Sequence, residues 1–285
     1  MEDFHQLIIM AERLMDFALA EDLAYGDPTT RAVLSSPARA TARISTKEDI
    51  VVAGAPFAAM VFNRLDLDAQ VRLPLDEGER AKAGTVILEI RSDAGALMAG
   101  ERVALNILAH LCGIATLTRT YCEKVPAGLK TRITYTRKTL PGLGVFQRYA
   151  VLTGGGHAHR PGLGAGILIK DNHIALAGSV KEAVSRARDS APHPLRIEVE
   201  AGNEQEVMEA LDAGADVLLL DNMSIDQVRH CVKLIGKRAV VEVSGGIRVQ
   251  DIPALAGAGV DIISAGALTH SAPASDLSLN VVSLD

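Results

Sequence analysis

Tryptophan is absent from this chain of 285 residues, and other aromatic residues are few, at four tyrosines and five phenylalanines. Cysteine is almost as scarce, with three residues at positions 112, 122 and 231 and no Cys-x-x-Cys pair. Their odd number and wide spacing support neither a disulfide framework nor a zinc knuckle. We therefore expect buried free thiols inside a compact α/β protein whose core is mainly aliphatic.

Long apolar runs are missing as well. The chain opens with Glu2 and Asp3 instead of the basic start and apolar stretch of a signal peptide. No apolar run approaches the roughly 20 residues that a membrane-spanning helix needs. The net charge of −6 argues against general nucleic-acid binding, which usually requires an excess of basic residues. The sequence predicts a soluble cytoplasmic protein that binds neither nucleic acid nor membrane.

Acidic residues disappear from one window, although they outnumber basic residues in the whole chain. No aspartate or glutamate lies between Lys124 and Lys170. The window nevertheless contains many basic residues: Lys124, Lys130, Arg132, Arg137, Lys138, Arg148, Arg160 and Lys170. A solvated basic surface normally mixes both signs, so this window predicts a pocket whose ligand supplies the negative charge. The run Gly154-Gly155-Gly156 and the pair His159-Arg160 suit a small, multiply charged ligand better than a polymer.

The sequence pattern changes near residue 113, which predicts two domains. Residues 1–113 combine a helical pattern at 4–20 with strand-like runs at 40–45, 50–53 and 85–90, as in an α/β sandwich. Helical patterns at 99–111 and 116–124 lead into the second domain, residues 114–270. The tail, residues 271–285, is expected to pack on the first domain.

The second domain repeats an apolar strand, a polar strand end and a helix. Strands are predicted at 131–135, 166–170, 195–200, 216–221, 239–244 and 261–264. Helices are expected to stop at Ala213-Gly214 and Ala256-Gly257. Such repetition is typical of βα units and predicts a parallel α/β barrel, in which all C-terminal strand ends form one face.

Polar residues and glycines follow these predicted strands. Lys170, Glu200 and Asp221 end three of them, and the turns Ser244-Gly245-Gly246 and Ala265-Gly266 follow the last two. Late glycine turns in barrels commonly bind phosphate through backbone N–H groups. Two carboxylates beside such a turn suit a magnesium-bound phosphate ester.

A series of short motifs also runs along the chain in a fixed order. They are Glu21-Asp22-Leu23, Gly26-Asp27, Gly100-Glu101-Arg102, Leu105-Asn106, Thr136-Arg137-Lys138-Thr139, Pro141-Gly142-Leu143, Tyr149-Ala150-Val151, Gly154-Gly155-Gly156, His159-Arg160, Ile169-Lys170-Asp171-Asn172-His173, Glu198-Val199-Glu200, Asp221-Asn222-Met223 and Gly266-Ala267-Leu268-Thr269-His270-Ser271. Nearly from end to end, the sequence resembles the quinolinate phosphoribosyltransferase family. The resemblance implies a type II phosphoribosyltransferase-like fold, with an N-terminal α/β sandwich and a parallel α/β barrel.

The resemblance also implies a reaction. Quinolinate and phosphoribosyl pyrophosphate (PRPP) would give nicotinate mononucleotide, pyrophosphate and CO2 in de novo NAD biosynthesis, with Mg²⁺ as cofactor and a homodimer as the working form. By the family pattern, the quinolinate carboxylates would be bound by Arg137, Lys138, His159, Arg160 and Lys170, and by Arg102 of the partner subunit. Bidentate guanidinium groups suit planar carboxylates.

The remaining roles concern the phosphoribosyl donor. Glu200 and Asp221 would hold the magnesium pyrophosphate and the ribose hydroxyls, while Ser244, Gly245, Gly246 and Gly266 would surround the 5′-phosphate. Lys138, Glu200 and Asp221 would be the catalytic residues. We expect catalysis by positioning and electrostatics, without a covalent protein nucleophile.

Three other interpretations are open to the sequence. Lys170 at a strand end also fits a Schiff-base aldolase. A related branch of the same fold, associated with molybdenum transport operons, keeps Thr-Arg-Lys-Thr but tends to lose the Lys-Asp-Asn-His run that this chain retains. A non-catalytic sensor of phosphorylated metabolites would not need Glu200 and Asp221 together with Lys138.

Two positions depart from the family pattern. Tyr135 stands before Thr136-Arg137, where the family usually has aspartate. Gly144 follows Pro141-Gly142-Leu143, where an arginine is usual. The two changes together would remove an internal ion pair or orient Arg137 differently, so they bear on the choice of acceptor substrate.

Overall fold

A computed structural model describes residues 4–285, with side chains from Gln6 onward, and the chain divides into two compact units. Unit 1 comprises the described residues up to Arg119, together with Leu140–Gly155 and Ala272–Asp285. Unit 2 comprises Thr120–Thr139 and Gly156–Ser271. The units therefore interleave along the chain, and unit 1 includes the tail, as expected, but also Leu140–Gly155, which the sequence-based boundaries at residues 113 and 270 left in the second domain.

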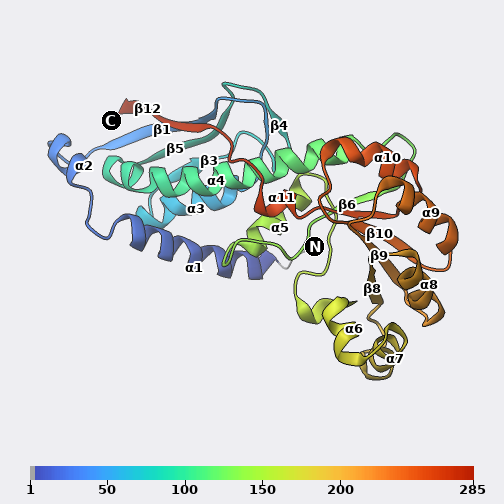
Figure 1. Cartoon of the computed structure of the whole chain (residues 1–285). Helices are drawn as coiled ribbons and strands as arrows, with labels where there is room; N and C mark the ends of the chain where they lie inside the picture. Colours follow the sequence, from blue (N-terminus) through green and yellow to red (C-terminus); the bar gives the residue numbers. More distant parts are fainter. Residues whose placement is uncertain (1–3) are drawn as a thin grey trace. The chain divides into compact units, whose positions relative to one another are not determined.

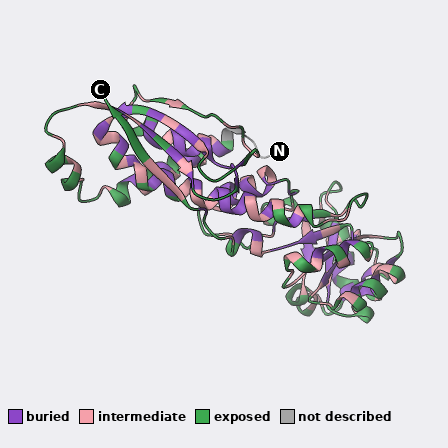
Figure 2. Cartoon of the chain, turned by 90° about the horizontal axis from the view of Figure 1, so that it is seen from above, coloured by how far each residue is buried: buried purple, intermediate pink, exposed green. Residues whose placement is uncertain are grey.

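Unit 1 is built on an antiparallel sheet with the strand order β12-β1-β5-β3 (Figure 1). Its strands are β1 (Arg39–Thr46), β3 (Gln70–Arg72), β5 (Val86–Asp93) and β12 (Leu277–Leu284), and a separate pair consists of β2 (Ile50–Val51) and β4 (Arg80–Ala81). Every second residue of β1, including Ala40, Ala42 and Ile44, is buried, as expected for a sheet with one face on the core. The edge strand β12 comes from the tail and is mostly exposed (Figure 2).

The helices of unit 1 are α1 (Phe4–Asp22), α2 (Pro28–Val33), α3 (Ala55–Leu65), α5 (Gly144–Thr153) and most of α4 (Ala94–Glu123). Helix α3 packs on β5 and β3 with a face that includes Phe57, Val61 and Phe62. Glu77 accepts hydrogen bonds from the backbone N–H groups of Gly54 and Ala55, at 2.7 and 3.0 Å. A carboxylate at this helix start satisfies donors that have no partner inside the helix.

Helix α4 corrects two expectations drawn from the sequence. It is one continuous helix, where two helical segments on either side of Gly113 were predicted. It is also long and apolar enough, by length and composition alone, to cross a membrane, so the prediction that no segment reaches this length was wrong. More than half of its apolar window is buried in the fold, as in the core helix of a soluble protein.

Gly113 explains why a glycine inside α4 does not mark a helix end. A Cβ atom at this position would collide with the backbone carbonyl of Pro273 in the tail. Two residues further along the tail, the N–H of Ser275 donates to the carbonyl of Ala109, at 2.9 Å. Gly113 therefore allows the tail to cross α4 in contact with its backbone.

Helix α5 lies in unit 1, although the sequence placed this segment in the barrel domain. Its buried face includes Phe146, whose ring lies edge-on to that of Phe57 with centroids 5.2 Å apart. Tyr149 of the same helix donates to Oε2 of Glu77, at 2.8 Å. These contacts, none of them visible in the local sequence pattern, assign the segment to unit 1.

Unit 2 contains a six-stranded, fully parallel sheet with the order β6-β11-β10-β9-β8-β7. Figure 1 labels β6, β10, β9 and β8 of this sheet. The strands are β6 (Arg132–Thr134), β7 (Ile167–Ile169), β8 (Ile197–Ala201), β9 (Val217–Asp221), β10 (Val240–Ser244) and β11 (Ile262–Ser264). Each lies within the predicted range or one residue beyond it, so the prediction of a parallel, barrel-like α/β domain is confirmed. Strands β6 and β7 are the two ends of the sheet.

The helices of unit 2 are α6 (Asp171–Ala177), α7 (Val180–Ser190), α8 (Glu204–Asp212), α9 (Ile225–Ile235), α10 (Ile252–Gly257) and α11 (Ala267–His270), with 3-10 turns η1 (Leu163–Ala165) and η2 (Val249–Asp251). Ser179, Asn203 and Ser224 accept hydrogen bonds from the first turns of α7, α8 and α9. Helices α8 and α10 end at the predicted Ala-Gly pairs.

The cysteines are free, as predicted. Cys112 and Cys231 are buried and Cys122 is half-buried. Burial raises the pKa of the Cys112 thiol to about 12, so it is not a reactive thiolate near neutral pH.

We predict that Gly113→Ala destabilises the protein. The added methyl group overlaps backbone atoms of Pro273, which cannot move aside as a flexible side chain would. Overpacking of this kind typically costs about 1–3 kcal/mol, measured as a lower midpoint of thermal or denaturant unfolding.

Gly257→Ala is the matched control, because Gly257 also lies in a helix but has open space around its Cβ position. Its unfolding midpoint should be unchanged or slightly raised. Equal midpoints for the two variants would contradict the proposed contact with the tail.

Candidate active site

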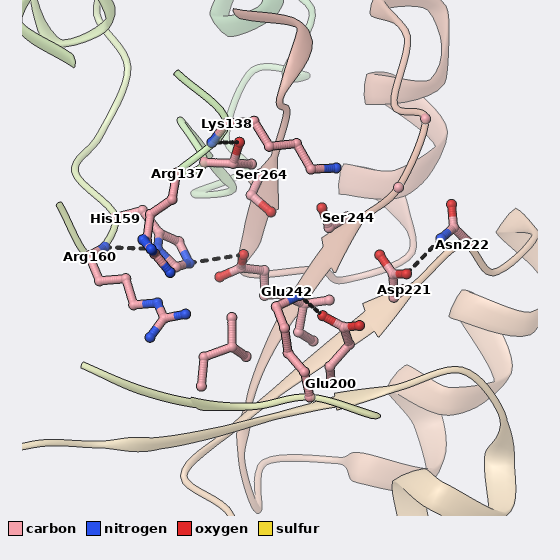
Figure 3. A pocket seen from close by; sticks show the side chains of 16 residues that line it. Arg137, Lys138, His159, Arg160, Glu200, Asp221, Asn222, Glu242, Ser244 and Ser264 are labelled. Atoms are coloured by element: carbon pink, nitrogen blue, oxygen red, sulfur yellow. Dashed lines mark hydrogen bonds and ion pairs between the residues drawn. The ribbon is translucent and has the colours of Figure 1, made fainter. Parts of the chain in front are cut away.

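A cavity of about 280 Å³ lies at the C-terminal ends of the parallel strands and is lined by residues of unit 2 (Figure 3). Its lining includes ten of the residues predicted from the sequence: Arg137, Lys138, His159, Arg160, Lys170, Glu200, Asp221, Ser244, Gly245 and Gly246. Gly266 is not part of this lining, and Arg102 is an exposed residue of α4 in unit 1.

The strands bring these residues together because side chains alternate between the two faces of a sheet. In β8, Ile197, Val199 and Ala201 are buried on one face, whereas Glu198 and Glu200 point to the other. The parallel register aligns Glu200 with Leu219, and Leu219 with Glu242. In the next row, Asp221 aligns with Ser244. The inner face therefore carries acidic residues at two depths.

The two most buried carboxylates of this face, Glu198 and Glu242, meet His159. Its Nε2 lies 3.2 Å from Oε1 of Glu242 and 3.8 Å from Oε2 of Glu198. The side chain of His159 is 14% exposed, that of Glu242 only 2%. The other ring nitrogen of His159, Nδ1, accepts a hydrogen bond from the backbone N–H of Arg160, at 2.8 Å (Figure 3). Nδ1 therefore carries a lone pair, and the ring proton on Nε2 faces the carboxylates.

Burial and charge shift the pKa values in this cluster. Burial, followed by the charge of Glu242, raises the pKa of Glu198 to about 8. For His159, burial lowers the pKa, but the hydrogen bond and charge of Glu242 and the charge of Glu198 outweigh it, so the pKa is raised. Within the described part of the chain, Oε1 of Glu198 is buried without a hydrogen-bond partner. The cluster therefore favours a bound proton.

The arginines occupy one side of the cavity. Arg160 donates from Nη1 to the carbonyl of Gly166, at 3.0 Å, which directs its guanidinium group along the cavity wall. Burial, and then the neighbouring charge of Arg137, lower the pKa of Arg160. Two guanidinium groups that repel each other across a small cavity form a site for an anion that neutralises both.

Glu200 and Asp221 end neighbouring strands and are both half-buried. Glu200 forms an ion pair with Nζ of Lys170, and Asp221 accepts from Nδ2 of Asn222, at 2.6 Å (Figure 3). Two carboxylates on one cavity wall match the hard oxygen donors that Mg²⁺ prefers, since this ion keeps waters and substrate phosphates as its other ligands. The residues thus fit a magnesium site completed by a phosphorylated substrate.

The turn after β10 requires a glycine at its first position. Gly245 has φ of 95°, and a Cβ atom there would collide with the side chain of Asn222. Asn222 itself has φ of 54°, an unusual value that asparagine tolerates better than most residues. The N–H of Asn222 donates to the carbonyl of Ser244, at 3.1 Å, and so joins the β9 and β10 turns.

Several residues singled out in the sequence have structural positions instead. Gly154 and Gly155 belong to unit 1, where a side chain on Gly154 would strike Ala115 and Thr118. Gly154 serves close packing, Gly155 has a φ of 95°, and neither lines the cavity. Gly144 begins α5 in unit 1. Of the eight basic residues in the window without acids, only Arg137, Lys138, Arg160 and Lys170 line the cavity.

Sequence reasoning assigned no role to the buried acids Glu198 and Glu242. Each lies in a strand that is largely apolar, at a position between two buried aliphatic side chains. Alternation inside a fully buried strand is the signal that could have identified them, because a parallel strand of a covered sheet is usually apolar on both faces.

The family of the chain is decided by two matches that together span most of it. Residues 27–112 match the model of the quinolinate phosphoribosyl transferase N-terminal domain, and residues 114–280 match that of the C-terminal domain. The chain belongs to the quinolinate phosphoribosyltransferase family. The resemblance inferred from the sequence motifs is thus confirmed.

Individual relatives of the chain carry names that agree with this family. A probable nicotinate-nucleotide pyrophosphorylase [carboxylating] of Bacillus subtilis is 41% identical over 273 residues, which cover 96% of this chain and 94% of the relative. The human nicotinate-nucleotide pyrophosphorylase [carboxylating] is 38% identical over 88% of this chain and 85% of its own length. The solved structure of the Francisella tularensis nicotinate-nucleotide pyrophosphorylase superposes with a TM-score of 0.89 at 36% identity, covering 96% of both chains.

We predict that protein stability falls as pH rises from about 4.5 to 8, and that Glu198→Gln reduces this fall. The pKa of Glu198 is about 8 in the folded protein, against an ordinary value of 4.5. A folded-state pKa above the unfolded one contributes stability below pH 4.5, and this is lost as pH rises through 8. The raised pKa of His159 acts in the same direction. Thermal unfolding across this pH range measures the slope.

Glu209→Gln, an exposed change on α8, is the control and should keep the slope of the unmodified protein. If Glu198→Gln has the same slope as this control, the carboxyl of Glu198 does not titrate as inferred.

Proposed function

We propose that the protein is a decarboxylating quinolinate phosphoribosyltransferase, a pentosyltransferase of de novo NAD biosynthesis. It transfers the phosphoribosyl group of PRPP to quinolinate and releases nicotinate mononucleotide, pyrophosphate and CO2. The observation that carries this proposal is one cavity in which four basic side chains face two strand-end carboxylates beside a glycine turn. Each of these features is consistent with the family to which the chain belongs.

The basic side of the cavity would take the acceptor. Quinolinate carries two adjacent carboxylates on a flat ring, and Arg137 and Arg160 provide two planar guanidinium groups. Lys138 and Lys170 add mobile charges on the same lining. His159 lies behind them, because both of its ring nitrogens already face protein groups.

The other side would take the donor. Ser244, Gly245 and Gly246, with Gly266 after β11, would surround the 5′-phosphate. Glu200 and Asp221 would contact the ribose hydroxyls and hold Mg²⁺, which when bound neutralises charge on the pyrophosphate. Lys170 pairs with Glu200 in the present structure, so binding of Mg²⁺ and quinolinate would separate this pair and give each group a new partner.

In the proposed reaction the ring nitrogen of quinolinate attacks C1 of the ribose while the bond from C1 to the pyrophosphate oxygen breaks. Pyrophosphate leaves with the bonding electrons, and the ring nitrogen becomes positively charged. The bond to the 2-carboxylate then breaks, CO2 departs, and a proton from solvent takes up the electron pair at C2. The protein binds both substrates in line and stabilises the leaving anion through Lys138.

We propose that the active form is a cytoplasmic homodimer in which Arg102 of the partner subunit completes the acceptor site. Arg102 is exposed on α4, and the cavity described here consists of unit 2 residues alone. A third guanidinium group would balance a substrate that brings several negative charges. The three free cysteines fit a reducing compartment.

Two alternatives from the sequence are less well supported. A Schiff-base lysine must present a neutral amine, but Lys170 is ion-paired with Glu200. A phosphometabolite sensor would not require Lys138, Glu200 and Asp221 on one cavity, and the relatives carry the name of an enzyme.

The test is product formation from quinolinate, PRPP and Mg²⁺, with nicotinate as a parallel acceptor and nicotinate mononucleotide followed by chromatography. We expect turnover of quinolinate and not of nicotinate. Lys138→Ala should lower turnover about a hundredfold or more while quinolinate still binds, because it removes charge that stabilises the departing pyrophosphate. Binding without any turnover by the unmodified protein would instead support the sensor.

Mixing two inactive variants tests the contribution of Arg102 from the partner. We expect Arg102→Ala and Lys138→Ala to be nearly inactive separately. After joint refolding, half of the dimers would be mixed, and each would contain one site with both residues intact. About a quarter of normal activity should return. If Arg102 acts within its own chain, mixing will restore nothing; if Arg102→Ala is fully active alone, the residue has no role at the site.

A further inference from the structure

Tyr135 is the departure from the family pattern that lies next to the site. It follows β6 directly and is 1% exposed, among the largest fully buried side chains of the described chain. Its hydroxyl donates a hydrogen bond to the backbone carbonyl of His159, at 2.9 Å. An aspartate, the usual residue at this position, would present a carboxylate that cannot donate to a carbonyl when ionised. The contact is therefore a property of this chain.

The contact extends a short parallel pairing at the end of the sheet. Strand β6 is an edge strand, and its outer side meets the segment that leads to His159. The N–H of His157 donates to the carbonyl of Ile133, at 2.7 Å, and His157 forms an isolated bridge with Thr134. Beyond this bridge, the Tyr135 hydroxyl is the next tie between the two segments. This side-chain hydrogen bond therefore extends the backbone pairing of the two segments by one contact.

His159 is held from three directions at once. Tyr135 binds its carbonyl, the N–H of Arg160 binds Nδ1, and Glu242 faces Nε2. Neither ring nitrogen is turned toward the open cavity for a substrate carboxylate. The ring instead fixes the peptide that leads into Arg160, because the bond from the Arg160 N–H to Nδ1 closes a small ring within the two residues.

The two segments that Tyr135 joins each carry one arginine of the cavity. Arg137 follows Tyr135 by two residues, and Arg160 follows His159 directly. Both guanidinium groups line the cavity, where burial, and then the repelling charge of Arg137, lower the pKa of Arg160. This repulsion tends to move the two segments apart. A tie between their backbones therefore preserves the spacing that a dicarboxylate needs.

We propose that Tyr135 is a positioning residue, which through His159 sets the spacing of Arg137 and Arg160 for an acceptor with two adjacent carboxylates. This inference rests on the proposed function, which makes quinolinate the acceptor. Tyr135 acts through the backbone and does not touch the substrate. The donor side, around Asp221 and Gly245, is independent of this contact.

The test is the steady-state kinetics of Tyr135→Phe, which removes the hydroxyl and keeps the buried ring. Loss of one neutral hydrogen bond should raise KM for quinolinate about three- to tenfold. KM for PRPP and kcat should stay within about twofold, since the donor side and the charge on the leaving group are unchanged.

Tyr121→Phe is the matched control. Tyr121 is also buried in unit 2, and its hydroxyl also donates to a backbone carbonyl, that of Ile247, at 3.2 Å. Its loss should leave KM for quinolinate unchanged. If Tyr135→Phe keeps a normal KM for quinolinate, if both its KM values rise alike, or if Tyr121→Phe raises KM for quinolinate equally, the inference is overturned.

Amide hydrogen exchange in residues 157–160 provides a measurement that does not depend on turnover. It should be faster in Tyr135→Phe than in the unmodified protein and unchanged in Tyr121→Phe. Equal exchange in all three proteins would overturn the inference. An unmodified protein that never uses quinolinate would overturn the proposed function itself, and the two failures are therefore distinguishable.

Discussion

The parallel register of β6 to β11 is the constraint on which the site depends. It places every C-terminal strand end on one face, and the two-residue alternation points Glu198, Glu200, Glu242 and Ser244 to the same side. A shift of one residue in β8 or β10 would exchange an acidic side chain for an aliphatic one. The helices outside the sheet need those aliphatic residues for their own packing, so the register of the core and the chemistry of the cavity are fixed together.

Charge balance is the second requirement, and it is met in layers. The basic side chains stand around the opening, while Glu198 and Glu242 lie beneath them with His159 between. Burying acids is costly, and here the cost is reduced by the raised pKa of Glu198, which favours its neutral form, and by the ring proton of His159 beside Glu242. Similar compensation occurs at Lys170 and Glu200, whose ion pair gives each charge a partner.

The sequence was a good guide to local structure and to the cavity. Strand and helix positions in unit 2 followed from hydrophobic periodicity and cap residues, because the period of a βα repeat leaves a clear local signal. Ten predicted residues line one cavity because strand ends in a parallel sheet must converge. It was a poorer guide to α4, where Gly113 looked like a break and is instead the place where the tail crosses, and to α5, whose partners Phe57 and Glu77 are remote in sequence.

What the sequence by itself determined, then, is the fold class, the family and the residue types at the strand ends, since these depend on short-range patterns and ordered motifs. What only the tertiary structure decided is which of those residues act on each other. The roles of Tyr135, His159 and Glu242 are examples, because hydrogen bonds between segments 24 and more residues apart leave no trace in local periodicity. Local sequence also does not distinguish the roles of two glycines. Gly245 lies in the turn of the site, where a side chain would collide with Asn222, whereas Gly154 allows close packing in unit 1.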